Sequence, residues 1–225
     1  MGARIIHRNE MASTHDQFIQ HVPYLIETSM KKDMTHVLLI SGHPDLAHSF
    51  ANKAIVEALQ GQLGEAIRVR RLDVLYPDYR IDVPAEQQAL LEADVIVWQF
   101  PFYWYSLPAL MKKWLDDVFL RGFAHGSTQK LAGKKLILSF TTGAPEAMYA
   151  YGQAMNYPVA DFLAPLRQTA LLCRFDYQEP VFSNGMMAIP GVSSDADFAA
   201  VKAKAEVHAS RLINKLIDLT QEEAA

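Results

Sequence analysis

The sequence predicts an α/β fold, a three-layer sandwich in which a parallel sheet of five strands lies between helices on both faces. Short apolar runs rich in branched residues recur along the chain, which is typical of strands buried on both faces. Helical patterns separate these runs, and strands that alternate with helices form right-handed crossovers in a parallel sheet. Ligands of such folds bind beyond the carboxyl ends of the strands, so the residues that follow each strand are the candidate site.

The predicted strands are five short apolar segments, and the first of them ends at Gly42, a turn signal. We expect Arg70 and Arg71 to lie at a solvated edge of the second strand. The five strands cover residues 36–41, 67–72, 94–100, 135–143 and, with a weaker pattern, 179–184.

The helices are predicted from apolar stripes and from the signals at their ends. Residues 49–63 follow the first strand, and residues 84–93 begin with Pro84, which the first turn of a helix tolerates. Residues 107–119 carry one buried stripe at helical spacing. Near the end of the chain, Ser194 and Asp197 resemble a capping box that opens a last helix.

Composition limits the classes of protein to which the chain can belong. A chain of 225 residues suits one domain, residues 36–220, with an N-terminal extension, residues 1–35, outside the pattern. The formal net charge of -4 argues against nucleic acid as a partner. No apolar stretch approaches the ~20 residues that cross a bilayer. The single cysteine, Cys173, is expected to be a buried small hydrophobe, and a cytoplasmic location fits its lack of an internal partner.

The loop after the first strand, "GHPDLAHSFANK", contains neither a dinucleotide-binding glycine pattern nor a P-loop. It offers His43, the hydroxyl of Ser49, the amide of Asn52 and the free N–H groups of a helix start, which can hold a phosphate. Ser49 is equally typical of an N-cap and His43 of a turn residue, so both interpretations stay open.

Aromatic residues crowd the loop after the third strand, around the segment "PFYWY". Such a loop can stack on a flat ring, and the alternative is an apolar patch covered by a subunit or by the core. The loop after the fourth strand, "TTGAPEAMYAYG", adds hydroxyls and a permissive Gly143. A phosphate site, an aromatic wall and a hydrogen-bonding turn at one edge indicate a mononucleotide-sized cofactor with a flat head. Flavin fits this description better than ATP, since no metal-phosphate apparatus is evident.

These loops, together with "LYPDYRIDVPAEQQALLEADVIVWQF" and "LAGKKLILSF", make the chain resemble the flavodoxin-like NAD(P)H:quinone oxidoreductases. The resemblance covers about residues 36–185 and is strongest to the ancillary oxidoreductase subunits of bacterial glutathione-gated potassium efflux systems. It implies the flavodoxin-like strand order 2-1-3-4-5 and bound FMN, with FAD as the alternative. It also implies NADPH or NADH as the electron donor, a quinone-like acceptor and a homodimer.

The resemblance also implies roles for individual residues. Tyr149, which follows the Thr-Thr-Gly turn, matches a tyrosine that helps hydride transfer in related quinone reductases. The residues implied to bind the flavin are His43, Ser49, Phe50, Ala51 and Asn52 around the phosphate, Pro101, Phe102, Tyr103 and Trp104 beside the isoalloxazine, and Thr141, Thr142, Gly143 and Ala144 at its polar edge.

The chain departs from the family pattern in three places. Ala144 and Pro145 replace a second glycine, Met155 and Asn156 occupy the region of a histidine that assists some relatives, and a glycine-rich run before "LAGKK" is missing.

Two other functions compete with that of a quinone reductase. One is a regulatory subunit of a membrane potassium efflux transporter, which would hold the protein at the inner membrane, with the flavin as redox sensor. The other is a flavodoxin-type one-electron shuttle. The modest net charge argues against it, because one-electron carriers commonly dock through an acidic face. The dispersed histidines predict no metal site.

Overall fold

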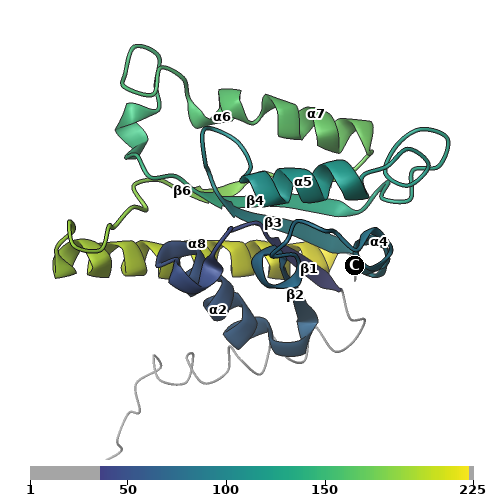
Figure 1. Cartoon of the computed structure of the whole chain (residues 1–225), viewed down its shortest axis with the longest axis horizontal. Helices are drawn as coiled ribbons and strands as arrows, with labels where there is room; N and C mark the ends of the chain where they lie inside the picture. Colours follow the sequence, from purple (N-terminus) through teal and green to yellow (C-terminus); the bar gives the residue numbers. More distant parts are fainter. Residues whose placement is uncertain (1–35, 223–225) are drawn as a thin grey trace, which may run out of the picture.

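A parallel sheet forms the middle layer of the structure, a computed structural model that describes residues 36–222. The sheet has the order β2-β1-β3-β4-β5, and β6 also pairs with β4 (Figure 1). The predicted extension, residues 1–35, lies outside the described residues. The strands are β1 (Val37–Ser41), β2 (Ile67–Arg71), β3 (Val95–Pro101), β4 (Lys135–Thr141), β5 (Asp176–Tyr177) and β6 (Val181–Ser183).

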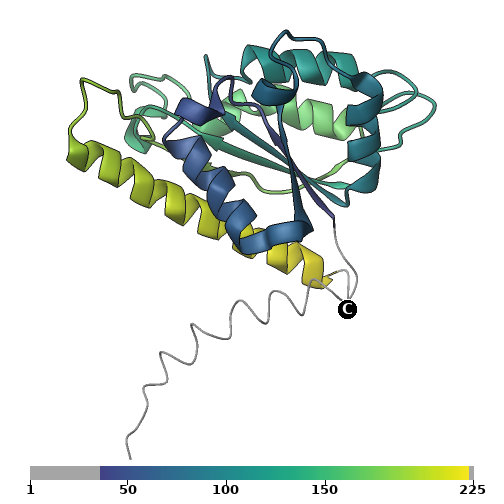
Figure 2. The same cartoon turned by 60° about the horizontal axis from the view of Figure 1, so that its bottom comes forward.

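Helices cover both faces of this sheet, because alternate strand residues are apolar on each side. Leu38 and Ile96 pack against α4, α5 and α7, whereas Val37 and Val95 pack against α2 and α8. Figure 2 shows α2 and α8 side by side on their face. The helices and 3-10 turns are η1 (Leu46–His48), α2 (Ala51–Leu63), η2 (Gly64–Ala66), α3 (Leu72–Leu75), α4 (Val83–Glu92), α5 (Ala109–Val118), η3 (Glu146–Met148), α6 (Val159–Phe162), α7 (Ala164–Leu172) and α8 (Asp195–Glu222).

The fifth position of the sheet is divided between two short strands, where the sequence predicts one strand over residues 179–184. Strand β5 pairs with the start of β4 and β6 with its end. Pro180 lies between them, and a proline has no N–H for the ladder. The N–H of Gln178 still bonds to the carbonyl oxygen of Leu136, at 2.9 Å. The predicted strand therefore begins too late and misses its first segment.

The signals at the helix ends act as the sequence predicts. Pro84 lies in the first turn of α4, and the side chain of Asp82 accepts the N–H of Ala85 at 3.1 Å. At the start of α8, the N–H of Ser194 bonds to the carboxylate of Asp197 at 2.8 Å, and the N–H of Asp197 bonds back to Ser194 Oγ at 3.3 Å. The predicted capping box is confirmed. Within residues 36–222, no helix combines the length and the apolar character needed to cross a membrane.

A buried carboxylate pairs with β2 from the neighbouring helix, α4. The Glu86 side chain is 0% exposed and accepts hydrogen bonds from Arg70, Tyr76 and, at 2.9 Å, the indole N–H of Trp114. Burial and the hydrogen bond to Glu86 raise the pKa of Tyr76 to about 12. The prediction that Arg70 lies at a solvated edge is therefore wrong, because Arg70 pairs with a buried carboxylate. The sequence does not show which distant acidic residue reaches Arg70.

Candidate functional site

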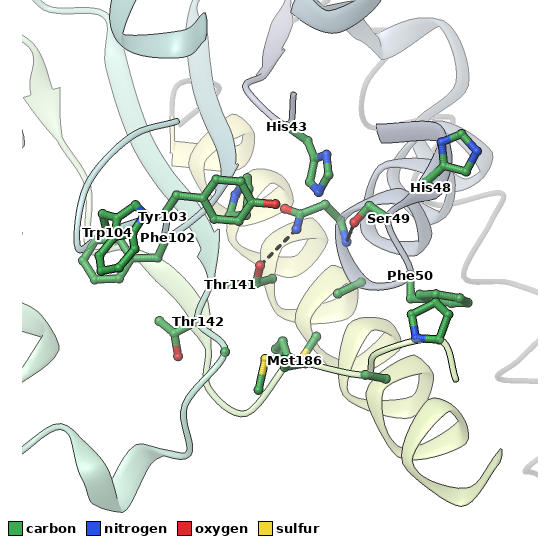
Figure 3. Close-up of a pocket in the computed structure, with 17 residues that line it drawn as sticks. His43, His48, Ser49, Phe50, Phe102, Tyr103, Trp104, Thr141, Thr142 and Met186 are labelled. Carbon is green, nitrogen blue, oxygen red and sulfur yellow. Dashed lines mark hydrogen bonds between the residues drawn. The ribbon is translucent and has the colours of Figure 1, made fainter. Parts of the chain in front are cut away.

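A cavity of about 510 Å³ opens at the carboxyl ends of β1, β3 and β4. The loops after these three strands form most of its wall, as Figure 3 shows. Every predicted cofactor-binding residue except Ala144 lines it, although their role in binding a flavin stays a prediction. These lining residues are His43, Ser49, Phe50, Ala51, Asn52, Pro101, Phe102, Tyr103, Trp104, Thr141, Thr142 and Gly143.

The sequence did not predict one part of the wall. His48 and the segment after β6 complete the cavity, the latter through Met186, Met187, Ala188 and Pro190. This segment follows a strand whose apolar pattern is weak. The rule that residues beyond each strand form the site would have found it, had it been applied to the fifth strand as well.

The N-terminus of α2 lies at the cavity and contributes to its wall. Ser49 Oγ accepts the N–H of Asn52 at 3.1 Å, so Ser49 does cap the helix. In the part of the chain that the structure describes, the N–H groups of Phe50 and Ala51 have no acceptor, which is usual for the first turn of a helix. Together with the helix dipole, these groups make the start of α2 favourable for an anion.

His43 is a neutral hydrogen-bond donor at the rim of this anion site. Its Nδ1 accepts the N–H of Asp45 at 3.0 Å, so the proton of the neutral ring lies on Nε2. Burial lowers the pKa of His43, and the negative charges of Asp73 and Asp45 oppose this shift. The imidazole lies edge-on to the ring of Tyr103, with the centroids 6.2 Å apart.

A carboxylate behind the first loop holds it in place. Asp73 Oδ2 accepts a hydrogen bond from the N–H of Leu46 at 3.0 Å, and it forms an ion pair with Arg71 Nη2 at 2.7 Å. The Asp73 side chain is only 8% exposed. Arg71, like Arg70, is therefore engaged in an ion pair and does not lie at a free, solvated edge.

The aromatic loop has an unusual backbone. Trp104 and Tyr105 both adopt positive φ angles, of 48° and 63°, which bulky residues rarely do. Tyr105 stacks on Phe162 of α6 at 4.9 Å, whereas Trp104 is 92% exposed. Strain of this kind persists where the surrounding structure enforces it and is common at functional sites. The loop thus presents Trp104 beside the cavity with nothing in residues 36–222 covering it.

The turn after β4 is fixed by hydrogen bonds to the segment after β6. Thr142 Oγ1 donates to Asn184 Oδ1 at 2.7 Å, and the carbonyl oxygen of Ala144 accepts the N–H of Gly185 at 2.8 Å. Ala144 therefore faces this segment and is not part of the cavity wall. Tyr149 also lies outside the wall, half-buried against the core, with its ring edge-on to Phe162.

A line of buried polar side chains continues from the cavity between the sheet and α8. It includes Asn52 and Thr141 of the wall and then Gln99, Ser139 and His208, all buried. Burial, with a smaller contribution from the charge of Arg211, lowers the pKa of His208 to about 3. His208 therefore stays neutral in the folded protein at any physiological pH.

This neutral histidine should make the protein sensitive to acid. Below the ordinary pKa of 6.5 the unfolded chain binds a proton at His208 that the folded chain excludes until about pH 3. Stability is therefore lost as pH falls through this window, by about 2 kcal/mol at about pH 5. We expect the free energy of unfolding to fall between pH 7 and pH 5 by that much more in the wild type than in His208→Gln. Equal losses, measured by urea denaturation, would contradict this expectation.

A family model described as a flavodoxin-like fold matches residues 35–209. The chain belongs to this flavodoxin-like family. The predicted flavodoxin-like fold and strand order are thereby confirmed. In this flavodoxin-like protein the direction of winding reverses between β1 and β3, where the cavity opens, as is usual for ligand sites of the fold.

Relatives of this flavodoxin-like chain confirm the resemblance found in the sequence. The glutathione-regulated potassium-efflux system ancillary protein KefG of Enterobacter sp. (strain 638) is 43% identical over 146 residues, 64% of this chain and 79% of KefG. General stress protein 14 of Treponema denticola, solved in complex with FMN, superposes with a TM-score of 0.70 at 33% identity, over 82% of this chain and 99% of that protein. An NADPH-quinone reductase of P. pentosaceus gives 0.62 at 26% identity, over 76% and 97%.

Proposed function

We propose that this protein is a flavin-dependent NAD(P)H:quinone oxidoreductase that holds FMN in the cavity beyond β1, β3 and β4. One observation carries the proposal: an anion site, an aromatic wall and a hydrogen-bonding turn meet in this single cavity. The similarity to general stress protein 14, which was crystallised with FMN, supports FMN over FAD.

The residues present fit this cofactor. The free N–H groups of Phe50 and Ala51 would hold the phosphate, and the rings of the Phe102 loop would lie beside the flavin. Thr141 and the turn that follows it would contact the polar edge. A volume of about 510 Å³ falls within the ordinary range of ligand pockets. When bound, FMN would supply the two-electron redox chemistry, which no side chain of the cavity can perform.

The chain's own residues would bind and orient the reactants. His43 Nε2–H is a fixed donor at the rim, and the aromatic wall would shield one face of the bound reactants from water. The reduced nicotinamide and the quinone would occupy this slot in turn. The Tyr149 hydroxyl would donate to negative charge that develops during transfer, because its usual pKa near 10 makes tyrosine a donor and not a base at neutral pH.

A second candidate function is that of an ancillary subunit of a potassium efflux transporter, which the 43% identity to KefG favours. In this proposal the protein lies at the inner membrane through the transporter, and otherwise in the cytoplasm. The exposed indole of Trp104 is one surface that a partner, or the second subunit of a homodimer, could cover. Redox activity and regulation of a transporter can coexist in one protein.

An anaerobic visible spectrum tests the proposal. The purified protein is reconstituted with FMN or FAD, and NADPH or NADH is added. We expect the absorbance of bound FMN to bleach rapidly when the reduced nicotinamide is added, and to return when a quinone is added. Bound FMN that does not bleach would favour the ancillary function. Failure to bind either flavin would contradict both.

A further inference from the structure

The floor of the cavity begins a line of hydrogen bonds between buried side chains. Asn52 Nδ2 donates to Thr141 Oγ1 at 3.0 Å, the dashed line at Thr141 in Figure 3. Gln99 Nε2 donates to Asn52 Oδ1 at 2.8 Å, and Ser139 Oγ donates to Gln99 Oε1 at 2.6 Å. None of these four side chains belongs to a residue more than 5% exposed. Burying polar side chains costs free energy unless their polar atoms are paired, and here each of the four side chains is hydrogen-bonded to the next.

The line continues to the surface through α8. His208, 0% exposed, lies between two hydroxyls, with Nε2 at 2.8 Å from Ser139 Oγ and Nδ1 at 3.0 Å from Ser183 Oγ. Arg211 Nη2 then donates to Ser183 Oγ at 2.8 Å and to the carbonyl oxygen of Phe182 at 2.6 Å. Arg211 is exposed and lies near the middle of α8, so the line joins the cavity to a solvated cation.

The chemistry of these groups gives the line one direction. The Ser139 hydroxyl donates its only proton to Gln99 Oε1, so its oxygen must accept a hydrogen bond from His208 Nε2–H. A neutral imidazole has a single N–H, so Nδ1 accepts the proton of Ser183, and Ser183 accepts from Arg211. In the reverse direction Arg211 and His208 would both donate to Ser183, whose own proton would have no acceptor in the line. A guanidinium can only donate, and it therefore favours the first direction.

We propose that Arg211, acting through this line, fixes Thr141 as a hydrogen-bond donor to the ligand of the cavity. Thr141 Oγ1 accepts from Asn52, and within residues 36–222 its own proton has no acceptor. Thr141 lines the cavity, so that proton is available to a ligand atom that accepts, such as a carbonyl oxygen or ring nitrogen of a flavin. Hydrogen bonds that all point one way polarise each other, so the remote cation strengthens this donor.

In this proposal Arg211, His208 and Ser139 are positioning residues, because they act on the ligand only through Thr141. The identity of the ligand rests on the proposed function, whereas the direction of the line does not. Neighbouring Lys204 offers a matched control. It lies on the same helix as Arg211, and both residues line a second cavity beside β6 and α8. The Nζ of Lys204, however, bonds to the carbonyl oxygen of Gly185, at 3.2 Å, and not to Ser183.

The first experiment is a fluorescence titration of the full-length protein with FMN. We expect Thr141→Val to weaken FMN binding about tenfold, because it removes one hydrogen bond to the ligand. Arg211→Met should weaken FMN binding about threefold, because it only weakens that hydrogen bond. Lys204→Met should bind as the wild type does. In the Thr141→Val background, Arg211→Met should have no further effect, because the donor through which it acts is gone. An equal effect of Lys204→Met, or an effect of Arg211→Met that persists without the Thr141 hydroxyl, would overturn the proposal.

The second measurement needs no cofactor. The ¹⁵N chemical shifts of the His208 ring, assigned by their loss in His208→Gln, report which nitrogen carries the proton. We expect the proton on Nε2 in the wild type and in Lys204→Met. A proton on Nδ1 would reverse the line and overturn the proposal. A protein that binds neither FMN nor FAD would instead contradict the proposed function, and the tautomer would still decide the direction.

Discussion

Replacing Arg70 by methionine is expected to lower the free energy of unfolding by about 3–5 kcal/mol, since it leaves a buried charge without its partner. Among residues 36–222, Glu86, whose side chain is 0% exposed, would keep only the hydroxyl of Tyr76 and the indole N–H of Trp114 as partners. Methionine preserves much of the aliphatic stem, so the loss reflects the charge and not the packing. Urea denaturation monitored by circular dichroism measures the difference.

A matched control lies two residues earlier on the same strand. Arg68 pairs with Glu92, but both side chains are at least half exposed, so Arg68→Met should cost far less than Arg70→Met. Adding Glu86→Leu to Arg70→Met should restore part of the lost stability, because an apolar replacement of a whole buried pair is often neutral. Similar losses at Arg68 and Arg70 would show that the buried carboxylate is not the cause.

Replacing Tyr149 by phenylalanine is expected to slow reduction of bound FMN by NADPH or NADH about ten- to hundredfold, the usual effect of losing a hydrogen bond to developing charge. The ring would still pack on the core beside Phe162, so the affinity for FMN should not change. Stopped-flow absorbance measures the rate and a fluorescence titration the affinity. Because Tyr149 lies outside the cavity wall, a slow variant would also mean that η3 approaches the cavity when the nicotinamide binds.

Tyr151→Phe is the control for this experiment. It makes the same chemical change two residues away, where the hydroxyl donates to Asp161 at the surface. Its reduction rate should equal that of the wild type. A Tyr149→Phe variant that is reduced as fast as Tyr151→Phe would remove Tyr149 from the mechanism.

Much of the fold and of the cavity follows from local patterns in the sequence. Apolar periodicity places the first four strands and the long helices, and the capping signal at Ser194 marks the start of α8. The three loops meet because parallel strands end at one edge of the sheet, so the predicted residues come together without any knowledge of their contacts. Only two predicted site residues, Ala144 and Tyr149, lie outside the cavity wall.

Polar pairing inside the fold could not be predicted in this way. His208 is 69 residues from Ser139 in the sequence, and Glu86 is 16 residues from Arg70. Periodicity shows which face of an element is buried, but it does not show which polar group of another element meets it there. Gln99 looks like one polar residue in an apolar strand, and its role in the line of hydrogen bonds depends on Asn52 and Ser139 from two other elements.

The broken fifth position of the sheet has a consequence for how copies of this protein behave when they meet. Strands β5 and β6 are two and three residues long and are separated by Pro180, so this edge offers no continuous row of backbone groups to a strand of another molecule. At the opposite edge β2 carries Arg68 and Arg71, whose partly exposed charges an added strand would have to desolvate. Both edges thus discourage aggregation by strand addition, even though the sheet between them is almost wholly apolar.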